Sequence, residues 1–262
     1  MATPSPRHDC SAHPAPDPLP PVLSLRNLHF RWPGAADDSL VITALDIAAG
    51  RTVFLHGPSG CGKSTLLGLL AGVLLARQGR VELMGQDWAA LPAGARDARR
   101  ADHVGVIFQQ FNLLPYLTVL DNVLLPCRFS ARRALRCAGA PRAAAQDLLQ
   151  RMALPEPFWS RRADALSMGQ QQRVAAARAL IGGPELVLAD EPTSALDGPL
   201  REDFMALLLQ ACAAAGSALV FVSHDERLAA RFDERLALPE LNRVVIGVTA
   251  GSRRDHGRIT AG

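Results

Sequence analysis

Lysine is almost absent from this chain. Of the 28 lysines and arginines among its 262 residues, only Lys63 is a lysine. Arginine therefore serves nearly everywhere that a positive charge is needed. The single exception indicates a chemistry that suits a compact ammonium on a slim stem better than a wide, planar guanidinium.

Other absences narrow the class of protein. The five cysteines include no C-x-x-C pair, which argues against a metal or disulfide framework and favours free thiols in a reducing compartment. No apolar run approaches the roughly 20 residues that span a bilayer, and the first residues lack the apolar core of a signal peptide. The pI of about 8.8 is below that of a dedicated nucleic-acid binder. We expect a soluble, cytoplasmic protein.

The order of apolar patterns predicts an α/β fold. Short apolar runs, typical of buried parallel strands, alternate with helical patterns, and a half-exposed strand precedes them at 22–32. The buried strands are expected at 51–56, 103–108, 185–190 and 218–223, and the helices at 64–76, 170–181 and 200–214.

Three further segments interrupt this alternation. Residues 1–21 hold seven of the 19 prolines and no periodic pattern, so we expect a disordered tail there. A second unstructured tail is expected at 244–262. The segment at about 111–170 is rich in Leu, Ala and Arg without a clear strand, and predicts a helical subdomain inserted into the α/β core.

The stretch HGPSGCGKSTLL, residues 56–67, contains the pattern G-x-x-x-x-G-K-[ST] between a predicted strand and a predicted helix. Glycines let backbone N–H groups turn inward around phosphate oxygens, and the helix N-terminus adds its positive dipole end. Lys63 would reach the β- and γ-phosphates, and Ser64 would ligate Mg²⁺. The pattern therefore predicts nucleotide binding by Gly57, Pro58, Ser59, Gly60, Cys61, Gly62, Lys63, Ser64 and Thr65.

This loop has plainer interpretations too. A glycine-rich strand-to-helix turn followed by a chance Lys-Ser would give the same letters. Cys61 is either a small tolerated side chain or a thiol activated by the helix N-terminus.

Two acidic residues end the apolar strand ELVLAD. Ligands of open α/β sheets bind at the carboxyl ends of strands, so Asp190 and Glu191 are expected near the phosphate loop. Asp190 suits Mg²⁺, and Glu191 is placed to orient or deprotonate a water. The alternative is a cap at the start of a helix.

The stretch ALSMGQQQRVAAARAL, residues 165–180, predicts a helix that begins with a capping box. Ser167 is followed by Gln170 three residues later, the spacing that satisfies two backbone N–H groups reciprocally. Because a helix N-terminus also attracts anions, a cap and a phosphate contact can coexist here.

Taken together, these motifs resemble the ATP-binding-cassette (ABC) ATPases. The resemblance covers roughly residues 22–243 and rests on four motifs in the family's order: GPSGCGKST, LSMGQQQR, LVLADEPTSALD and the triplet SHD at 223–225. It implies a P-loop NTPase (RecA-like) core with an antiparallel β subdomain and an inserted α-helical subdomain. It also implies ATP and Mg²⁺ as ligands.

The resemblance assigns roles around the nucleotide. Gly57–Thr65 corresponds to the Walker A loop, Asp190 to the Walker B aspartate, and Glu191 to the catalytic glutamate. Gln109 matches the Q-loop glutamine, which senses the metal and water and couples to a membrane partner. With Ser64 and Asp190, it completes the implied metal set.

Three further positions carry over. His224 matches the switch histidine that contacts the γ-phosphate, although a lone His after a strand is also an ordinary solvated loop residue. Asp197 matches the D-loop at the dimer interface. Trp32 falls where the family places an aromatic ring against adenine, with Phe30 as its rival.

The signature loop departs from the family's usual LSGGQ. Ser167, Met168, Gly169 and Gln170 are expected to close over the ATP of a partner subunit, but Met168 replaces a glycine. Either its side chain points away from the nucleotide, or the composite site is weakened or regulated.

The stretch FQQFNLLPYLTVLDNVLLP, residues 108–126, resembles the LolD/MacB group of exporter ATPases. This implies a head-to-tail homodimer that powers a separate FtsX/MacB-like permease from the inner face of the membrane. Two alternatives stay open: a regulatory cassette that signals through a permease-like partner, and a soluble nucleic-acid-associated cassette. No nucleic acid is expected as a partner, since the arginine clusters at 131–136 and 161–162 fit a solvated helical face.

Overall fold

A computed structural model of the chain describes residues 21–194 and 196–244. The tails predicted at 1–21 and 244–262 lie outside the described residues, except that Pro21 begins the first strand and Val244 ends the described part. No helix within these described ranges is long and apolar enough to cross a bilayer.

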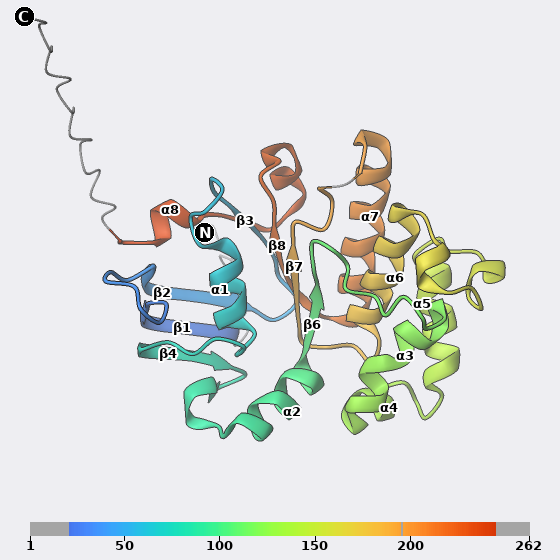
Figure 1. The fold of residues 1–262 in the computed structure, drawn as a ribbon, viewed down its shortest axis with the longest axis horizontal. Helices are drawn as coiled ribbons and strands as arrows, with labels where there is room; N and C mark the ends of the chain where they lie inside the picture. The colour runs from blue at the N-terminus through green and yellow to red at the C-terminus, as the bar shows by residue number, and fades with distance from the viewer. Residues whose placement is uncertain (1–20, 195, 245–262) are drawn as a thin grey trace, which may run out of the picture.

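The described chain contains two sheets (Figure 1). One is antiparallel in the order β2-β1-β4-β5, and the other is parallel in the order β6-β7-β8-β3-β9. The antiparallel strands are β1 (Pro21–Phe30), β2 (Leu40–Ala48), β4 (Gln78–Leu83) and β5 (Gln86–Asp87). The parallel strands are β3 (Thr52–His56), β6 (Val104–Ile107), β7 (Leu186–Asp190), β8 (Ala218–Val222) and β9 (Glu234–Ala237).

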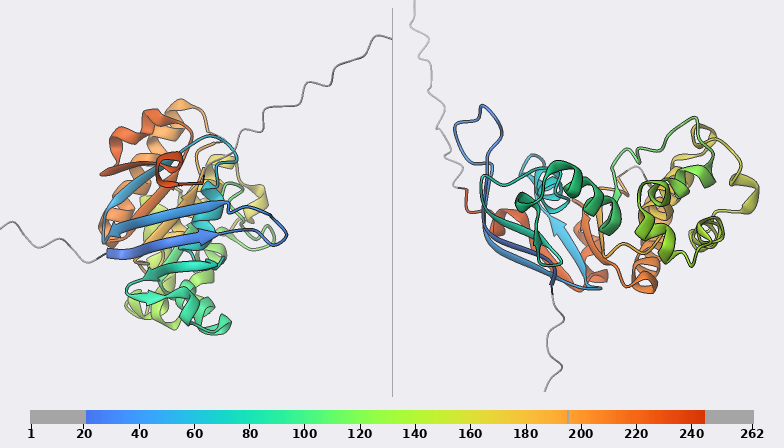
Figure 2. Two further views of the ribbon diagram at one scale, coloured as in Figure 1. Left: turned by 90° about the vertical axis from the view of Figure 1, so that its left-hand side faces the viewer. Right: turned by 90° about the horizontal axis from the view of Figure 1, so that it is seen from below.

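Helices surround the parallel sheet. The longer ones are α1 (Lys63–Leu70), α2 (Ala93–His103), α3 (Val119–Phe129), α4 (Ala131–Arg136), α5 (Pro141–Arg151), α6 (Met168–Leu180) and α7 (Gly198–Ala215). The 3₁₀ helices are η1 (Trp88–Ala90), η2 (Glu156–Phe158), η3 (Ala163–Ala165) and η4 (Glu226–Arg231), and α8 (Leu238–Leu241) is a single turn of α-helix. The segment at 111–170 contains α3, α4 and α5, which Figure 2 shows as a lobe away from the antiparallel sheet.

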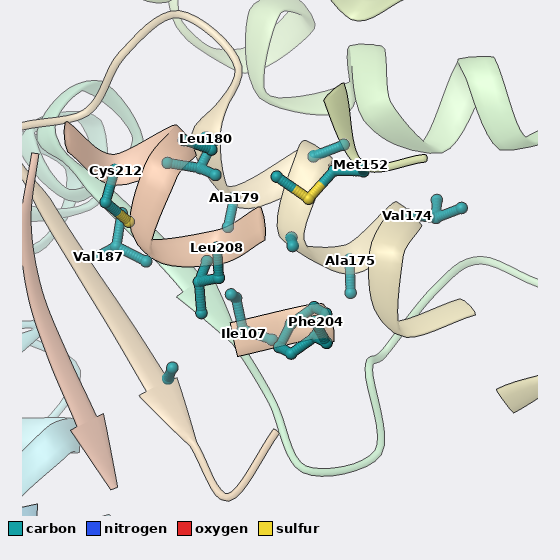
Figure 3. Close-up of a cluster of buried hydrophobic side chains, with 14 of the residues drawn as sticks. Ile107, Met152, Val174, Ala175, Ala179, Leu180, Val187, Phe204, Leu208 and Cys212 are labelled. Carbon is teal, nitrogen blue, oxygen red and sulfur yellow. The ribbon is translucent and has the colours of Figure 1, made fainter. Parts of the chain in front are cut away.

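The two faces of the parallel sheet bury separate cores because successive side chains of a strand point to opposite sides. On one face Val53 and Leu55 join α1 and the antiparallel sheet, so α1 lies between the two sheets (Figure 1). On the other face Phe54 joins α6, α7 and the helical lobe. Figure 3 shows part of this second core, where Ile107 and Val187 meet Leu208 and Cys212 of α7.

The strands predicted at 22–32, 51–56, 103–108, 185–190 and 218–223 are confirmed to within a few residues, as is the α/β class. The helix predicted at 64–76 is wrong at its end, because α1 stops at Leu70. Gly72 takes φ +66° there, and a Cβ on it would lie 2.5 Å from the buried ring of Trp88. The chain therefore turns under Trp88 instead of continuing the helix.

Candidate functional site

The carboxyl ends of four neighbouring parallel strands converge on one edge of the sheet. β3 ends at His56, directly before the glycine-rich loop, and β7 ends at Asp190. Gln109 follows β6 by two residues, and His224 follows β8 by two residues. Since β6, β7, β8 and β3 are adjacent in that order, residues distant in sequence come together at this edge.

The loop between β3 and α1 has a backbone that only glycine adopts readily. Gly60 and Gly62 have φ angles of +79° and +104°, in the left-handed region. A Cβ on Gly62 would also lie 3.0 Å from Leu40 Cδ2 on the neighbouring sheet. Gly62 is the N-cap of α1 and has no side chain to cap it, so the first N–H groups of the helix remain available to a ligand.

Lys63 is held within this loop. Its side chain is buried, with the residue 8% exposed, and Nζ donates to the carbonyl oxygens of Gly57 and Pro58, each at 2.9 Å. The ammonium thus lies inside the loop that surrounds it. A slim stem with a pointlike charge fits this enclosure, in agreement with the interpretation of the single lysine.

A cavity of about 360 Å³ lies beside the loop. It brings together nine of the residues predicted to bind or act on a nucleotide, from three separate segments of the chain. They are Ser59, Gly60, Gly62, Lys63, Ser64, Thr65, Gln109, Asp190 and Glu191. Gly57 and Pro58 line an adjoining cavity of about 420 Å³ together with His224.

Asp190, the last residue of β7, is partly buried beside other charged and polar groups. Burial raises the pKa of the Asp190 carboxyl above its ordinary value, and the charge of Glu191 acts the same way, whereas Ser64 and Lys63 lower it. A partly desolvated carboxylate beside a serine hydroxyl supplies oxygen ligands suited to Mg²⁺, which is normally held by one or two carboxylates and substrate phosphates. Within the described ranges, no cluster of three His, Cys, Asp or Glu side chains could hold a metal alone.

Glu191 has an unusual backbone. Its φ of +44° is in the left-handed region, which non-glycine residues enter rarely and mainly at functional sites. Its backbone N–H donates to the carbonyl of Val222 at 3.0 Å, and its Oε2 lies 3.2 Å from Nδ1 of His224. The predicted catalytic glutamate and the predicted switch histidine are therefore in contact.

The signature residues form a different site. Ser167 caps α6, and the capping box with Gln170 is confirmed. Met168 is 54% exposed and lines a cavity of about 560 Å³ with Ser167, Gly169 and Gln170. That cavity shares no lining residue with the one beside the phosphate loop.

Two other predicted residues lie outside the 360 Å³ cavity. Trp32 is 45% exposed and packs edge-on against Phe30 at a ring distance of 5.2 Å, whereas Phe30 is buried in the core. Of these two rings, Trp32 is therefore the one with surface free for a ligand. Asp197 is exposed and caps α7 by accepting from Leu200 N at 3.2 Å, so it has a structural task besides any interface.

Two residues near the site were not predicted. Gln172 is fully buried, and its Nε2 donates to the carbonyl of Pro192 at 2.6 Å, next to Glu191. Arg201 donates to the carbonyl of Leu196 at 2.9 Å and also to Asp225. The sequence could have predicted the burial of Gln172, because it lies on the same helix face as Ala176 and Ala179, four and seven residues later.

The fold and the loop define a class. A parallel sheet with a phosphate loop between β3 and α1, facing an Asp-Glu pair at the end of β7, is the arrangement of a P-loop nucleotide hydrolase. Residues 41–194 match the family model described as ABC transporter. The chain therefore belongs to the ABC transporter ATP-binding family and is an ATPase domain.

Proteins similar in sequence support this family assignment. The chain is 43% identical over 199 residues to an uncharacterized ABC transporter ATP-binding protein of Mycobacterium bovis, covering 74% of this chain and 57% of that protein. It is 40% identical over 219 residues to the macrolide export ATP-binding/permease protein MacB of Shigella flexneri, covering 81% of this chain. The match spans only 32% of MacB.

A solved structure of similar fold supports the same assignment. The dimeric post-hydrolysis state of the ATP-binding cassette MJ0796, bound to ADP and Pi, superposes with a TM-score of 0.72 at 34% identity. That alignment covers 82% of this chain and 93% of MJ0796.

Proposed function

We propose that this chain is the ATPase subunit of an exporter of the LolD/MacB kind. It binds MgATP, pairs head-to-tail with a second copy, and powers a separate FtsX/MacB-like permease from the inner face of the membrane. The observation that carries the proposal is the convergence of Lys63, Ser64, Asp190 and Glu191 on one cavity. The resemblance to the cassette part of MacB supports the exporter class.

The nucleotide would lie along the phosphate loop. Lys63 and the N–H groups at the start of α1 bind the phosphates, and Trp32 offers its exposed ring to the base. Ser64, Asp190 and Gln109 would supply oxygens for Mg²⁺, and the charge of the ion would offset that of the phosphates. Asp190, partly buried, favours an ion partner because an isolated buried carboxylate is costly.

Hydrolysis needs a positioned water near the γ-phosphate. Glu191 projects into the same cavity and would accept a hydrogen bond from that water, orienting or deprotonating it. His224, 3.2 Å from Glu191, is placed to steady the carboxylate and to contact the γ-phosphate. The chemistry depends on positioning and charge neutralisation more than on covalent steps.

A second copy would complete the site. Ser167, Gly169 and Gln170 open on a separate cavity, so within one chain they do not line the phosphate cavity. Head-to-tail pairing would present them to the nucleotide of the partner, with Met168 at the edge of that contact and Asp197 at the interface.

The permease would dock beside Gln109. The preceding residue, Phe108, lines a groove of about 380 Å³ with Phe129 of α3, and these two rings are 42% and 77% exposed. Arg100 and Arg178 also line it. Asp97 lines the groove as well and pairs with Arg100 at 2.6 Å, and Arg178 donates to the carbonyls of Phe111 and Asn112. The two exposed rings therefore fit a cytoplasmic permease segment that carries an apolar residue.

Co-purification tests this proposal. The Glu191→Gln variant, loaded with ATP, is purified from detergent-solubilised membranes of its own cell, with Lys63→Ala as the control that does not retain ATP. A polytopic permease recovered only with Glu191→Gln supports the proposal, and transport by that complex separates an exporter from a regulatory cassette. Recovery of RNA- or DNA-associated proteins instead would contradict it.

A further inference from the structure

Arg201 joins two segments that carry proposed functional residues. It lies in the first turns of α7, and one end of its guanidinium donates to the carbonyl of Leu196 at 2.9 Å. The other end donates to the carboxylate of Asp225. Leu196 directly precedes Asp197, and Asp225 directly follows His224. One side chain therefore links the backbone beside the proposed dimer contact to the loop of the proposed phosphate sensor.

This link is enclosed by protein. The side chains of Arg201 and Asp225 are 20% and 13% exposed, unlike most ion pairs of the described chain. Hydrogen bonds from Arg227 and Arg201 hold the pKa of Asp225 well below its usual range, so its carboxylate is charged at neutral pH. The carboxylate also accepts from the backbone N–H of Arg227, which caps the turn after His224. Each member of the pair therefore also contacts the backbone: Arg201 donates to the carbonyl of Leu196, and Asp225 accepts from the N–H of Arg227.

The position of Arg201 is not explained by the helix that carries it. A cation near a helix N-terminus opposes the helix dipole and is locally unfavourable. Its Nε is buried and has no hydrogen-bond partner among the residues that the structure describes. Burying a guanidinium with an unpaired N–H costs free energy that an apolar residue of similar length would avoid. Such a local conflict points to a task outside the helix.

We propose that Arg201 is a positioning residue for ATP hydrolysis, which holds the Leu196–Asp197 backbone and the His224 loop in one fixed arrangement. The planar fork of arginine suits this task because it reaches a carbonyl and a carboxylate at the same time, whereas an ammonium is a single point charge. The inference rests on the proposed function, since it presumes that Asp197 and His224 act as described there.

Three variants isolate the link. Arg201→Met removes the two Nη groups that make both hydrogen bonds and keeps an unbranched stem that reaches as far as the position of Nε. Arg201→Lys keeps the charge without the fork. Arg227→Met is the matched control. Arg227 also donates to Asp225, at 2.8 Å, but its side chain is 82% exposed and has no bond to Leu196. The control therefore removes an arginine partner of Asp225 without breaking the link.

The readouts are kcat, KM for ATP and the melting temperature of the full chain. We expect Arg201→Met to lower kcat by about tenfold to 100-fold, the scale of a misplacement of reacting groups, while KM stays within about twofold. Arg201→Lys should recover part of kcat, and Arg227→Met should resemble wild type. Equal kcat in Arg201→Met and Arg227→Met would overturn the proposal. So would a loss of ATP affinity and melting temperature in parallel with kcat, which marks general damage.

Failure of the underlying assignment gives a different result. If Glu191→Gln hydrolyses ATP as fast as wild type, the catalytic site itself is misassigned. If Glu191→Gln is inactive and Arg201→Met matches wild type, only the positioning role of Arg201 is overturned.

Discussion

Gln172 of the signature helix donates a hydrogen bond across 2.6 Å to the carbonyl oxygen of Pro192, the residue after Glu191. The side chain is fully buried, so this bond is shielded from water. It joins the helix that begins at Ser167 to the segment that carries the proposed catalytic glutamate. A displacement of the start of α6 would therefore also displace the backbone next to Glu191.

Removing this bond should affect rate and stability together. Gln172→Met keeps the length of the side chain but leaves the buried Pro192 carbonyl without its donor, which costs about 1–3 kcal/mol of the free energy of unfolding. Part of this cost is offset, because the substitution also removes Gln172 Oε1, which is buried without a partner among the described residues. We expect kcat to fall while KM for ATP changes little. Steady-state kinetics and denaturant unfolding measure both effects. Gln150→Met, on an exposed face of α5, is the control. A loss of stability without any change in kcat would show that the bond serves the fold alone.

Lys63 should dominate ATP affinity. Lys63→Ala removes charge-assisted hydrogen bonds worth about 1.5–3 kcal/mol each, so we expect affinity to fall by at least about tenfold per bond lost. Lys63→Arg should also bind poorly, because the wider guanidinium does not fit inside the loop. Calorimetric titration with ATP and Mg²⁺ measures this, and Glu191→Gln should retain affinity. Wild-type affinity in Lys63→Ala would contradict the assignment of the loop.

Cys61 offers a probe of occupancy that needs no catalysis. It lies within the phosphate loop and is partly exposed, whereas Cys137 and Cys212 are buried. ATP lying along the loop should cover its thiol and slow alkylation by maleimide, followed peptide by peptide with mass spectrometry. Cys127 of α3 is also partly exposed and is the internal reference for the effect of ATP. Burial and the neighbouring Cys137 raise its pKa to about 12, so it should react slowly, at the same rate with and without ATP. Identical rates at Cys61 with and without ATP would sink this idea.

Glu185 should make the free energy of unfolding depend on pH in the acidic range. Burial by itself would raise the pKa of its carboxyl, but hydrogen bonds from His103 and Arg132 outweigh it and lower the pKa to about 2. A lowered folded-state pKa contributes stability above the ordinary value of 4.5, and that stability is lost as pH falls toward 2. Arg136 also contacts this carboxylate, at 2.6 Å, and links it to α4.

Glu185→Gln tests this expectation. At pH 7 the variant should be less stable by about 1–2 kcal/mol, a value reduced to allow for solvent screening. The difference from wild type should shrink between pH 4.5 and pH 2, as wild type loses the same contribution. Denaturant unfolding across this range measures it, with the exposed Glu234→Gln as the control. A difference that stays constant with pH would refute the ion-pair explanation.

The parts of the fold that sequence predicts are those set by local rules. The buried strands are continuous apolar runs, and the phosphate loop depends on glycines such as Gly60 and Gly62 whose φ angles other residues avoid. The capping box at Ser167 likewise needs only residues three apart. These patterns carry their structural meaning within a few residues, so they could be interpreted without the fold.

Other features depend on distant contacts. The strands β2 and β4 pair with β1, and their mixed burial gives no clean alternation to read. The end of α1 is set by Trp88, which comes 18 residues after Leu70 and donates to its carbonyl at 3.1 Å. The contact of Arg201 with Asp225 forms only because the fold places α7 beside the loop after β8. Such contacts appear in no local pattern.

In the dimer that we propose, the phosphate loop of one copy and the signature residues of the other form a shared ATP site. The most direct test is the molar mass of Glu191→Gln in solution with and without ATP and Mg²⁺. We expect the 28.0 kDa monomer to become a dimer when ATP is added, and a further Ser167→Arg substitution to abolish this change. A variant that binds ATP and remains monomeric, or a dimer that forms equally well with Ser167→Arg, would contradict it.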